Sequence, residues 1–210
     1  ISAGLTTGDT LSFTNQNGIS GTFNAASGVL TLTGTASTAF YQAALRSVKF
    51  SSSSENPTVT SVSRTIQWVV NDGMANSAIV TSSVNITPVN DPPVATAGAS
   101  LAYTEGQPAA PIDATVTVSD PDNSNLVSAK VTISAGLTSG DILAVASQNG
   151  IIGVFDSSTG ILTLNGASST ANYQTALRSV TYRTTSGNPT ALSPNRTITW
   201  VVNDGSATSN

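Results

Sequence analysis

Acidic residues are scarce in this chain, and several stand where their oxygens could bind a hard cation. Three groups attract attention: Asn90 with Asp91, Asp120 with Asp122, and Asp204 on its own. Asp120 and Asp122 project to the same side of an extended segment, because side chains alternate with a period of two along a strand. Ca²⁺ binds roughly six to eight oxygens, mostly from carboxylates and carbonyls. These residues are therefore candidate calcium ligands.

The same motifs also have a purely structural explanation. Asp-Pro-Asp-Asn at 120–123 and Asn-Asp-Gly at 203–205 are turn sequences, in which Asp and Asn side chains bond to their own backbone. The Asn-Asp-Pro-Pro run at 90–93 is suited to a stiff connector, since proline fixes φ and restricts the residue before it. Each motif alone favours a turn, whereas their occurrence together favours a metal site.

Other chemistry has little support in the composition. The chain has no histidine and no cysteine, so it cannot form a Ser-His-Asp or Cys-His triad from its own residues. A glycosidase-like carboxylate pair stays open by residue count. The acidic residues fall in predicted turns, however, and two positions recur in both halves of the chain. We therefore expect a protein that is not an enzyme.

Charge and hydropathy limit the partners. The formal net charge is −4 and no cluster of Lys and Arg occurs, so a nucleic-acid surface is not expected. No apolar run approaches the ~20 residues that a membrane-spanning helix needs, and we expect no membrane insertion. The chain begins within a repeat, so we expect it to be an excerpt of a longer protein.

The acidic motifs lie within an internal repeat. Residues 1–78 align without a gap with residues 133–210, and 46 of the 78 positions are identical. The best-kept block runs from Arg64 to Gly73 and returns as Arg196 to Gly205. Self-similarity of this kind marks an array of like modules. We place one module at 1–90, without its opening strands, and a second at 91–210, without its closing strand.

Turn and alternation signals predict the elements of each module. The Asn17-Gly18 pair is a hairpin signal, and we expect a three-stranded meander over 10–33. Residues 37–47 combine a Ser/Thr start with helix formers, which predicts one or two helical turns capped by Ser37 or Thr38. Further strands are expected at 48–51, 64–70, 79–87, 100–104, 114–119 and 127–134. Trp68 is expected in the core, and Tyr41 and Tyr173 are expected to pack the helical turn, with sugar stacking as the alternative.

Short strands with frequent turns and no βαβ pattern predict an all-β protein of tandem antiparallel β-sandwiches. The segment from Trp68 to Val94, with Thr104-Glu105-Gly106 and Asp120-Pro121-Asp122 after it, resembles the end and beginning of consecutive cadherin repeats. The order of these motifs is most similar to the cadherin-like tandem repeats of large secreted bacterial adhesins of the repeats-in-toxin type. The resemblance covers essentially the whole chain and implies Greek-key modules, each with one short helical turn.

The resemblance also implies roles for individual residues. Asp120, Asp122 and Asp204 would be carboxylate ligands of one Ca²⁺ at the linker, with a carbonyl from Asn90. Asp91 would bridge toward a neighbouring site. Glu105 would serve the junction at the far end of its module. Asp72 would be the counterpart, in the first module, of Asp204. The Asp-Arg-Glu motif of animal cadherins is missing, so we expect one ion at each junction.

The implied function is structural. We expect an extracellular, cell-surface extender module in which Ca²⁺ stiffens the linkers, with a role in cell adhesion and biofilms. Its partners would be neighbouring modules of the same chain, and like chains or cell-surface glycans. Two alternatives remain: a carbohydrate-binding accessory module, and a filament subunit completed by strand exchange between chains.

Overall fold

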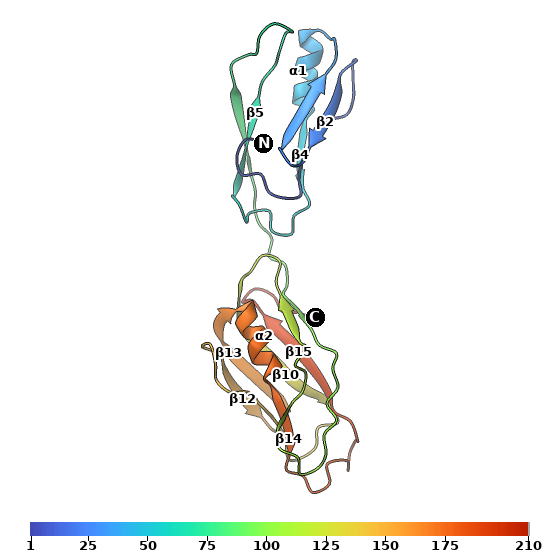
Figure 1. Cartoon of the computed structure of the whole chain (residues 1–210), viewed down its shortest axis with the longest axis vertical. Coiled ribbons are helices and arrows are strands. Elements are labelled where there is room, and N and C mark those ends of the chain that lie inside the picture. Colours follow the sequence, from blue (N-terminus) through green and yellow to red (C-terminus); the bar gives the residue numbers. More distant parts are fainter. Residues whose placement is uncertain (210) are drawn as a thin grey trace. The chain divides into compact units, whose positions relative to one another are not determined.

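The computed structural model describes residues 1–209, which form two compact units, Ile1–Val89 and Asn90–Asn210. They are called the first and the second unit below, and Figure 1 shows the elements of each. The division lies one residue from the predicted module boundary. Strands predominate, with one short helix in each unit, and the predicted all-β sandwich class is confirmed.

The second unit is a two-layered sandwich. Its larger sheet has the strand order β12-β13-β10-β15, and its smaller sheet has the order β11-β14-β8, while β7 pairs with β9. All of these pairs are antiparallel. The bounds are β7 Val94–Thr96, β8 Ala110–Pro111, β9 Thr117–Ser119, β10 Asn125–Ala135, β11 Asp141–Ala144, β12 Ile152–Asp156, β13 Ile161–Ser169, α2 Thr170–Arg178, β14 Thr181–Thr184 and β15 Thr197–Asn203.

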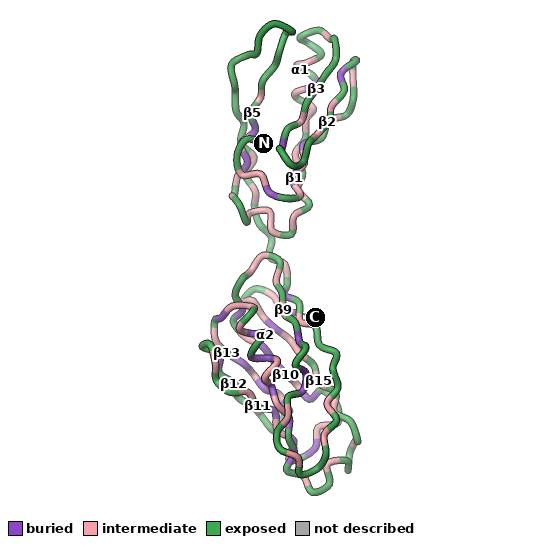
Figure 2. Tube along the Cα trace, viewed as in Figure 1, coloured by how far each residue is buried: buried purple, intermediate pink, exposed green. Residues whose placement is uncertain are grey.

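The core of the second unit lies between these layers and beneath α2. Strand β10 is its centre, because β13 and β15 pair with its two edges and alternate residues, among them Val131, are fully buried. Figure 2 shows the buried positions gathered along β10, β13 and α2. Buried β-branched and leucine side chains on facing sheets are the expected source of stability for such a sandwich.

The first unit repeats the pattern with fewer pairings. Strand β1 pairs with β4, β2 with β3, and β5 with β6. The bounds are β1 Asp9–Ser12, β2 Ser20–Asn24, β3 Val29–Thr33, α1 Thr38–Arg46, β4 Lys49–Ser52, β5 Ser63–Trp68 and β6 Val80–Asn85. Its buried hydrophobic residues are Leu11, Ile19, Ala44 and Ile66, whereas the described part of the second unit has sixteen.

The predicted helical turns are confirmed. The Ser37 hydroxyl accepts the backbone N–H of Phe40 at 3.3 Å and so caps α1. Ser169 caps α2 through Asn172 in the same way. A hydroxyl at this position satisfies one of the backbone donors that a helix start leaves without a partner. Neither helix in the described residues is long and apolar enough to cross a membrane.

The predicted three-stranded meander is wrong. Strand β1 pairs with β4 and shares no sheet with the β2–β3 hairpin. The Asn17-Gly18 turn forms, with Asn17 at φ 51°, but it closes only an isolated bridge between Gln16 and Ile19. The chain thus passes from one layer of the sandwich to the other at this turn, which a hairpin signal cannot distinguish from a turn within one sheet.

The strand expected at 100–104 is also wrong, and the one at 114–119 is shorter than predicted, because only β9 forms there. Leu101 and Tyr103 pack on the core, which explains the alternation in the sequence. The backbone next to them is held otherwise: the Asp113 carboxylate accepts the N–H groups of Gly98 and Ala99 at 2.9 and 3.0 Å. Side-chain alternation alone therefore gave a false strand.

A buried ion pair joins the two layers of each unit. In the second unit, Arg196, directly before β15, donates to Asp141 of β11 through Nε at 2.6 Å and Nη2 at 3.2 Å. In the first unit Arg64 bonds to Asp9 through the same atoms, and both side chains are completely buried. Two parallel hydrogen bonds of this kind fix the orientation of both groups.

Loss of one partner should be costly. Arg196→Met leaves the Asp141 carboxylate buried without its counter-charge, and we expect it to destabilise the second unit by about 3–5 kcal/mol. The double variant Asp141→Leu with Arg196→Met should recover most of this loss, since the uncompensated charge is gone. Urea unfolding measures both, with Lys130→Met, at an exposed position, as the control. Equal stability of the single and double variants would contradict this account.

The ion pairs also predict a loss of stability in acid. Burial alone would raise the pKa of Asp141, but Arg196, Tyr182 and the N–H of Thr138 outweigh it and lower the pKa below its ordinary value of 3.8. A carboxyl with a lowered pKa stabilises the fold above the unfolded value, and that contribution is lost as the pH falls through the folded value. Wild-type stability should therefore decline below about pH 3.8. The double variant should decline less steeply, as followed by circular dichroism at a series of pH values.

Candidate metal centre

Two acidic loops of the second unit lie at the ends of strands. The first follows β9, where the Asp120 Oδ1 atom accepts the backbone N–H groups of Asp122 and Asn123 at 3.1 and 2.7 Å. The second follows β15, where the Asp204 Oδ1 atom accepts the N–H groups of Ser206 and Ala207, both at 2.6 Å. Each loop is thus an Asp-centred turn, which leaves the other carboxylate oxygen, Oδ2, for further contacts.

Asn90, the first residue of the second unit, joins these loops. Its Nδ2 donates to Asp204 Oδ2 at 2.8 Å, and its Oδ1 accepts from Asn123 Nδ2 at 2.7 Å. Asn123 also approaches Asp204 Oδ2 at 3.4 Å and Asp122 Oδ1 at 3.2 Å. The backbone N–H of Asp91 donates to Asp122 Oδ2 at 3.1 Å. Four of the predicted ligands therefore share one hydrogen-bonded cluster, namely Asn90, Asp91, Asp122 and Asp204. Asp120 fixes the loop at 120–123 through its backbone hydrogen bonds.

The Oδ2 atom of Asp120 stands out within this cluster. It is buried and has no hydrogen-bond partner, and among the described residues it is the one buried side-chain oxygen or nitrogen in that state. Burial raises the pKa of Asp120, and the adjacent Asp122 carboxylate raises it further. A buried acceptor without a partner is costly unless a ligand, ion or water meets it.

Asp204 has the opposite electrostatic character. Burial alone would raise its pKa, but the N–H groups of Ala207 and Ser206 and the amide of Asn90 outweigh burial and lower the pKa. The side chain therefore stays ionised at neutral pH. The cluster combines a carboxylate that is stabilised as an anion with one whose charge is poorly compensated.

The side chains of the cluster fit a hard cation in donor type. Throughout residues 1–209, no three acidic side chains converge closely enough to hold a metal ion by themselves. A cation here would need amide or backbone oxygens in addition to carboxylates, as calcium sites often have. Asn90 and Asn123 can supply such oxygens if their amides turn, because an amide presents oxygen on one side and nitrogen on the other.

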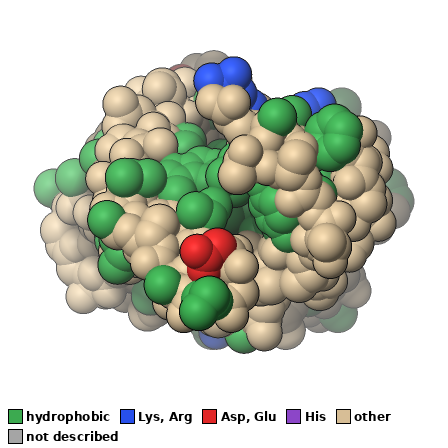
Figure 3. All heavy atoms as spheres, turned by 90° about the horizontal axis from the view of Figure 1, so that it is seen from above, with side chains coloured by type: hydrophobic (Ala, Val, Ile, Leu, Met, Phe, Trp, Pro, Cys, Tyr) green, Lys and Arg blue, Asp and Glu red, His purple; other side chains and the backbone are tan. Residues whose placement is uncertain are grey.

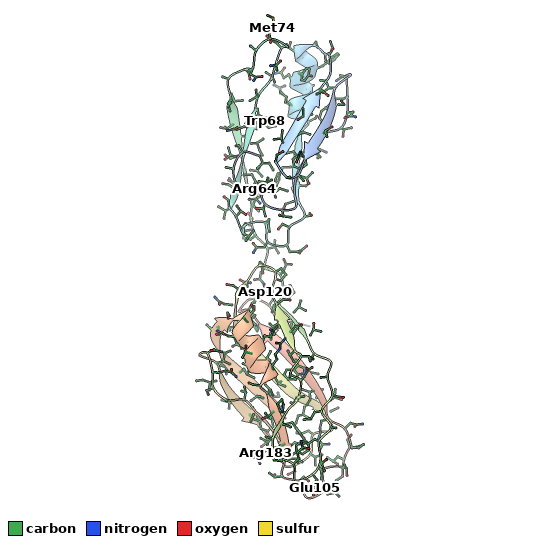
Figure 4. The ribbon with its side chains drawn as sticks, viewed as in Figure 1. Arg64, Trp68, Met74, Glu105, Asp120 and Arg183 are labelled. Atoms are coloured by element: carbon green, nitrogen blue, oxygen red, sulfur yellow. The ribbon has the colours of Figure 1, made fainter. Side chains whose placement is uncertain are left out.

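The remaining predicted ligands lie elsewhere. Figure 4 shows Glu105 at the end of the second unit opposite Asp120, in a turn at Thr104–Gln107 and exposed to solvent. Asp72 belongs to the first unit, where its Oδ1 accepts the N–H groups of Met74 and Ala75, both at 2.9 Å. That turn copies the one at Asp204, but no Asp-x-Asp loop accompanies it in the first unit.

Asp113 organises the opening of the second unit, and the pattern of acidic residues did not single it out. It is almost completely buried, and its Oδ1 accepts the N–H and hydroxyl of Thr115 at 2.7 and 2.5 Å. Burial opposes ionisation, but these bonds and those from Gly98 and Ala99 hold its pKa well below the ordinary range. The Asp-x-Thr spacing at 113–115 was the available signal, because such side chains bond backbone two residues on.

The aromatic residues serve packing. Tyr173 is completely buried and donates its hydroxyl to the Gly166 carbonyl at 2.7 Å, as Tyr41 does to Gly34. Trp200 packs against the core of the second unit. Trp68, expected in the core, is only half-buried, and its indole N–H donates to the Ser82 hydroxyl at 3.0 Å. Phe40 is the sole exposed large aromatic among the described residues.

Comparison with known proteins gives one similarity. The chain is 34% identical over 131 residues to halomucin from Haloquadratum walsbyi. The matched stretch covers 60% of this chain but 1% of halomucin, which is therefore a very long protein. No protein-family model and no solved structure matches the chain, so the cadherin-like resemblance has no support from these comparisons.

The variant Asp120→Asn should remove the charge of Asp120 and keep the hydrogen bonds that form its turn. A carboxyl whose folded pKa is raised destabilises the fold once the pH exceeds its unfolded pKa. The amide keeps the Oδ1 acceptor and places an N–H donor toward Asp122. In a chelating buffer at neutral pH, we expect the variant to melt about 1–4 °C above wild type. Calorimetry measures this shift, with Asp156→Asn at the exposed end of β12 as the control. A variant that melts well below wild type would show that the Asp120 charge is already compensated.

Proposed function

We propose that this chain is a pair of structural extender modules from a large extracellular surface protein, and that Ca²⁺ bound at the start of the second unit stiffens it. Two findings support the structural part: the modules repeat each other, with 46 of 78 aligned positions identical, and a matching stretch makes up 1% of the very long halomucin. A chain built from repeated sandwiches gains length by adding modules, each with its own core.

One observation carries the calcium part of the proposal. Asn90, the loop at 120–123 and the turn at Asp204 are distant in sequence but share one hydrogen-bonded cluster, beside a buried carboxylate oxygen without a partner. If the Asp-Pro-Asp-Asn and Asn-Asp-Gly turns served only to reverse the chain, their side chains would not need to contact each other. The convergence therefore favours a shared ligand.

The mechanism is charge neutralisation. Bound Ca²⁺ would supply positive charge to the carboxylates of Asp120, Asp122 and Asp204. The residues of the chain do the rest: Asp120 and Asp204 fix their loops through backbone N–H groups, and Asn90 and Asp91 attach the incoming chain to both loops. Without the ion, repulsion between carboxylates would loosen these attachments.

The proposed roles in adhesion and biofilms rest on the cadherin-like resemblance. In an adhesin of this kind, calcium-stiffened linkers would hold a binding end away from the cell, and the modules would contribute to cell adhesion and biofilms. Neighbouring modules of the same chain would be the immediate partners. A weak extracellular site, with a dissociation constant around 10⁻⁴–10⁻³ M, would fill in sea water or tissue fluid.

Calcium should stabilise the second unit. At a free Ca²⁺ concentration about one hundred times the dissociation constant, binding to the folded state alone adds about 2.7 kcal/mol. Calorimetry with Ca²⁺ and with chelator should show this as a higher melting temperature for wild type. The response should disappear in Asp120→Asn and in Asp204→Asn.

Two controls keep this test specific. Asp156→Asn changes a carboxylate at the end of β12, outside the cluster, and should respond to Ca²⁺ as wild type does. Mg²⁺ should have a weaker effect, since it demands a smaller octahedral site and loses its waters reluctantly. A melting temperature that Ca²⁺ leaves unchanged would refute the calcium site but would leave the extender role standing.

A further inference from the structure

We propose that Asn85 and Asn195 are acceptor sites for N-linked glycans, one in each unit. Each asparagine begins an Asn-x-Thr triplet, Asn85-Ile86-Thr87 in the first unit and Asn195-Arg196-Thr197 in the second. This triplet is the acceptor signal for N-linked glycans on the surface of secreted proteins. The inference rests on the extracellular part of the proposed function, since such glycans are attached to exported chains, and it is independent of the calcium site.

The sequence itself separates these two triplets from two others. The chain has four Asn-x-Thr triplets and no Asn-x-Ser triplet. In the remaining two, at 56–58 and 188–190, the middle residue is proline, which removes the acceptor signal. These two triplets are copies of each other, 132 positions apart. Each unit therefore contains one usable triplet and one triplet that proline blocks.

Both usable triplets present their reacting groups to solvent. The asparagine and the threonine are exposed in each one, at Asn85, Thr87, Asn195 and Thr197. The middle residue turns inward: Ile86 is half-buried, and Arg196 donates to the buried Asp141 carboxylate at 2.6 Å. Neighbouring side chains of an extended segment point to opposite faces, so an inward middle residue directs the asparagine and the threonine outward together.

The two triplets occupy the same place in the fold although they lie on different strands. The counterpart of Asn195 in the first unit is Ser63, because equivalent positions differ by 132. Ser63 is the first residue of β5, and Asn85 lies directly opposite it on β6. A glycan on either asparagine would therefore leave its unit beside the start of β5 or of its counterpart β15.

Neighbouring strands leave this place accessible. In the first unit the backbone on both sides of the start of β5 is present: Ala3 bridges to Thr65, and Asn85 lies opposite Ser63. Even with both neighbours in place, Asn85 is exposed and Ser63 is only half-buried. The accessibility of the two sites thus belongs to their outward direction from the sandwich.

The modification would be a transfer of a glycan to an amide nitrogen. The Nδ2 atom of the asparagine forms a bond to the anomeric carbon of the sugar. The bond from that carbon to the oxygen of a lipid-linked diphosphate breaks, and the diphosphate leaves with the electron pair. Nδ2 gives up one proton to a base of the transferase. The co-reactants are therefore a lipid-diphosphate-linked oligosaccharide and an oligosaccharyl transferase.

A glycan would add hydrophilic surface to a protein with few charges. Only 9% of the residues are charged, and Figure 3 shows a face of the first unit on which hydrophobic and uncharged polar groups far outnumber charged ones. N-linked glycans are bulky and solubilising. Asn195 and Asp204 flank β15, whose seven residues extend about 23 Å, so the glycan and the metal centre would lie at opposite ends of this strand.

Peptide mapping of the protein isolated from the surface of the cells that produce it tests the proposal. Trypsin releases Thr184–Arg196, which contains both Asn195 and the proline-blocked Asn188. Fragmentation of this peptide should place a glycan on Asn195 and none on Asn188. The peptide Thr65–Lys130 should carry a glycan on Asn85.

Variants expressed in the same cells separate acceptor chemistry from folding. Asn195→Gln and Thr197→Ala should both lose the glycan of the second unit, although the second variant keeps the asparagine. Thr197→Ser should retain it, because the hydroxyl remains. The matched control Asn188→Gln should leave both glycans in place, and Asn195→Gln should respond to Ca²⁺ as wild type does.

The outcomes distinguish this proposal from the proposed function. Surface protein in which either asparagine is bare would overturn the assignment of that site and leave the extender role intact. A glycan on Asn188, or one on Asn195 that persists in Thr197→Ala, would also overturn the proposal. Protein confined to the cytoplasm of its own cells would overturn the extracellular role and this inference together.

Discussion

The interaction on which each unit depends is the buried pair between an arginine and an aspartate. Asp141 belongs to β11 of the smaller sheet, and Arg196 directly precedes β15 of the larger one. The guanidinium also donates to the carbonyls of Pro189 and Ser193, so one side chain fixes both the layers and the loop before β15. Only 9% of the residues are charged, yet each unit buries two charges, which costs desolvation free energy. The hydrogen bonds that these two side chains form with each other and with the backbone offset that cost.

The position of the candidate metal centre follows from this arrangement. With β15 held in place at its start, its far end brings Asp204 to the same end of the sandwich as the loop after β9. Asn90 meets both loops there because β7, which begins at Val94, pairs with β9. The cluster therefore belongs to the second unit alone, and its geometry is produced by the strands of that unit.

Comparison of the two units shows what one strand contributes. Strand β10 pairs with both β13 and β15 in the larger sheet and supplies much of the core of the second unit. The equivalents in the first unit of residues that β10 covers are more exposed. Even so, the helix caps, the Tyr hydroxyl contacts and the buried ion pair are the same in both units. These features therefore form without a strand equivalent to β10, whereas the burial of Trp200, Leu162 and Val202 in the second unit accompanies that strand.

The sequence by itself determined the repeat, the all-β class, the capped helices and the turns, because these depend on periodicity and on side chains that bond within a few residues. It also drew attention to Asn90, Asp120, Asp122 and Asp204, although it could equally explain each one as part of a turn. Only the tertiary structure decided that their loops meet, that Asp120 Oδ2 is buried without a partner, and that β1 pairs with β4. It likewise revealed the ion pairs, whose partners are 55 residues apart. Contacts across sheets depend on which strands become neighbours, and no local pattern carries that information.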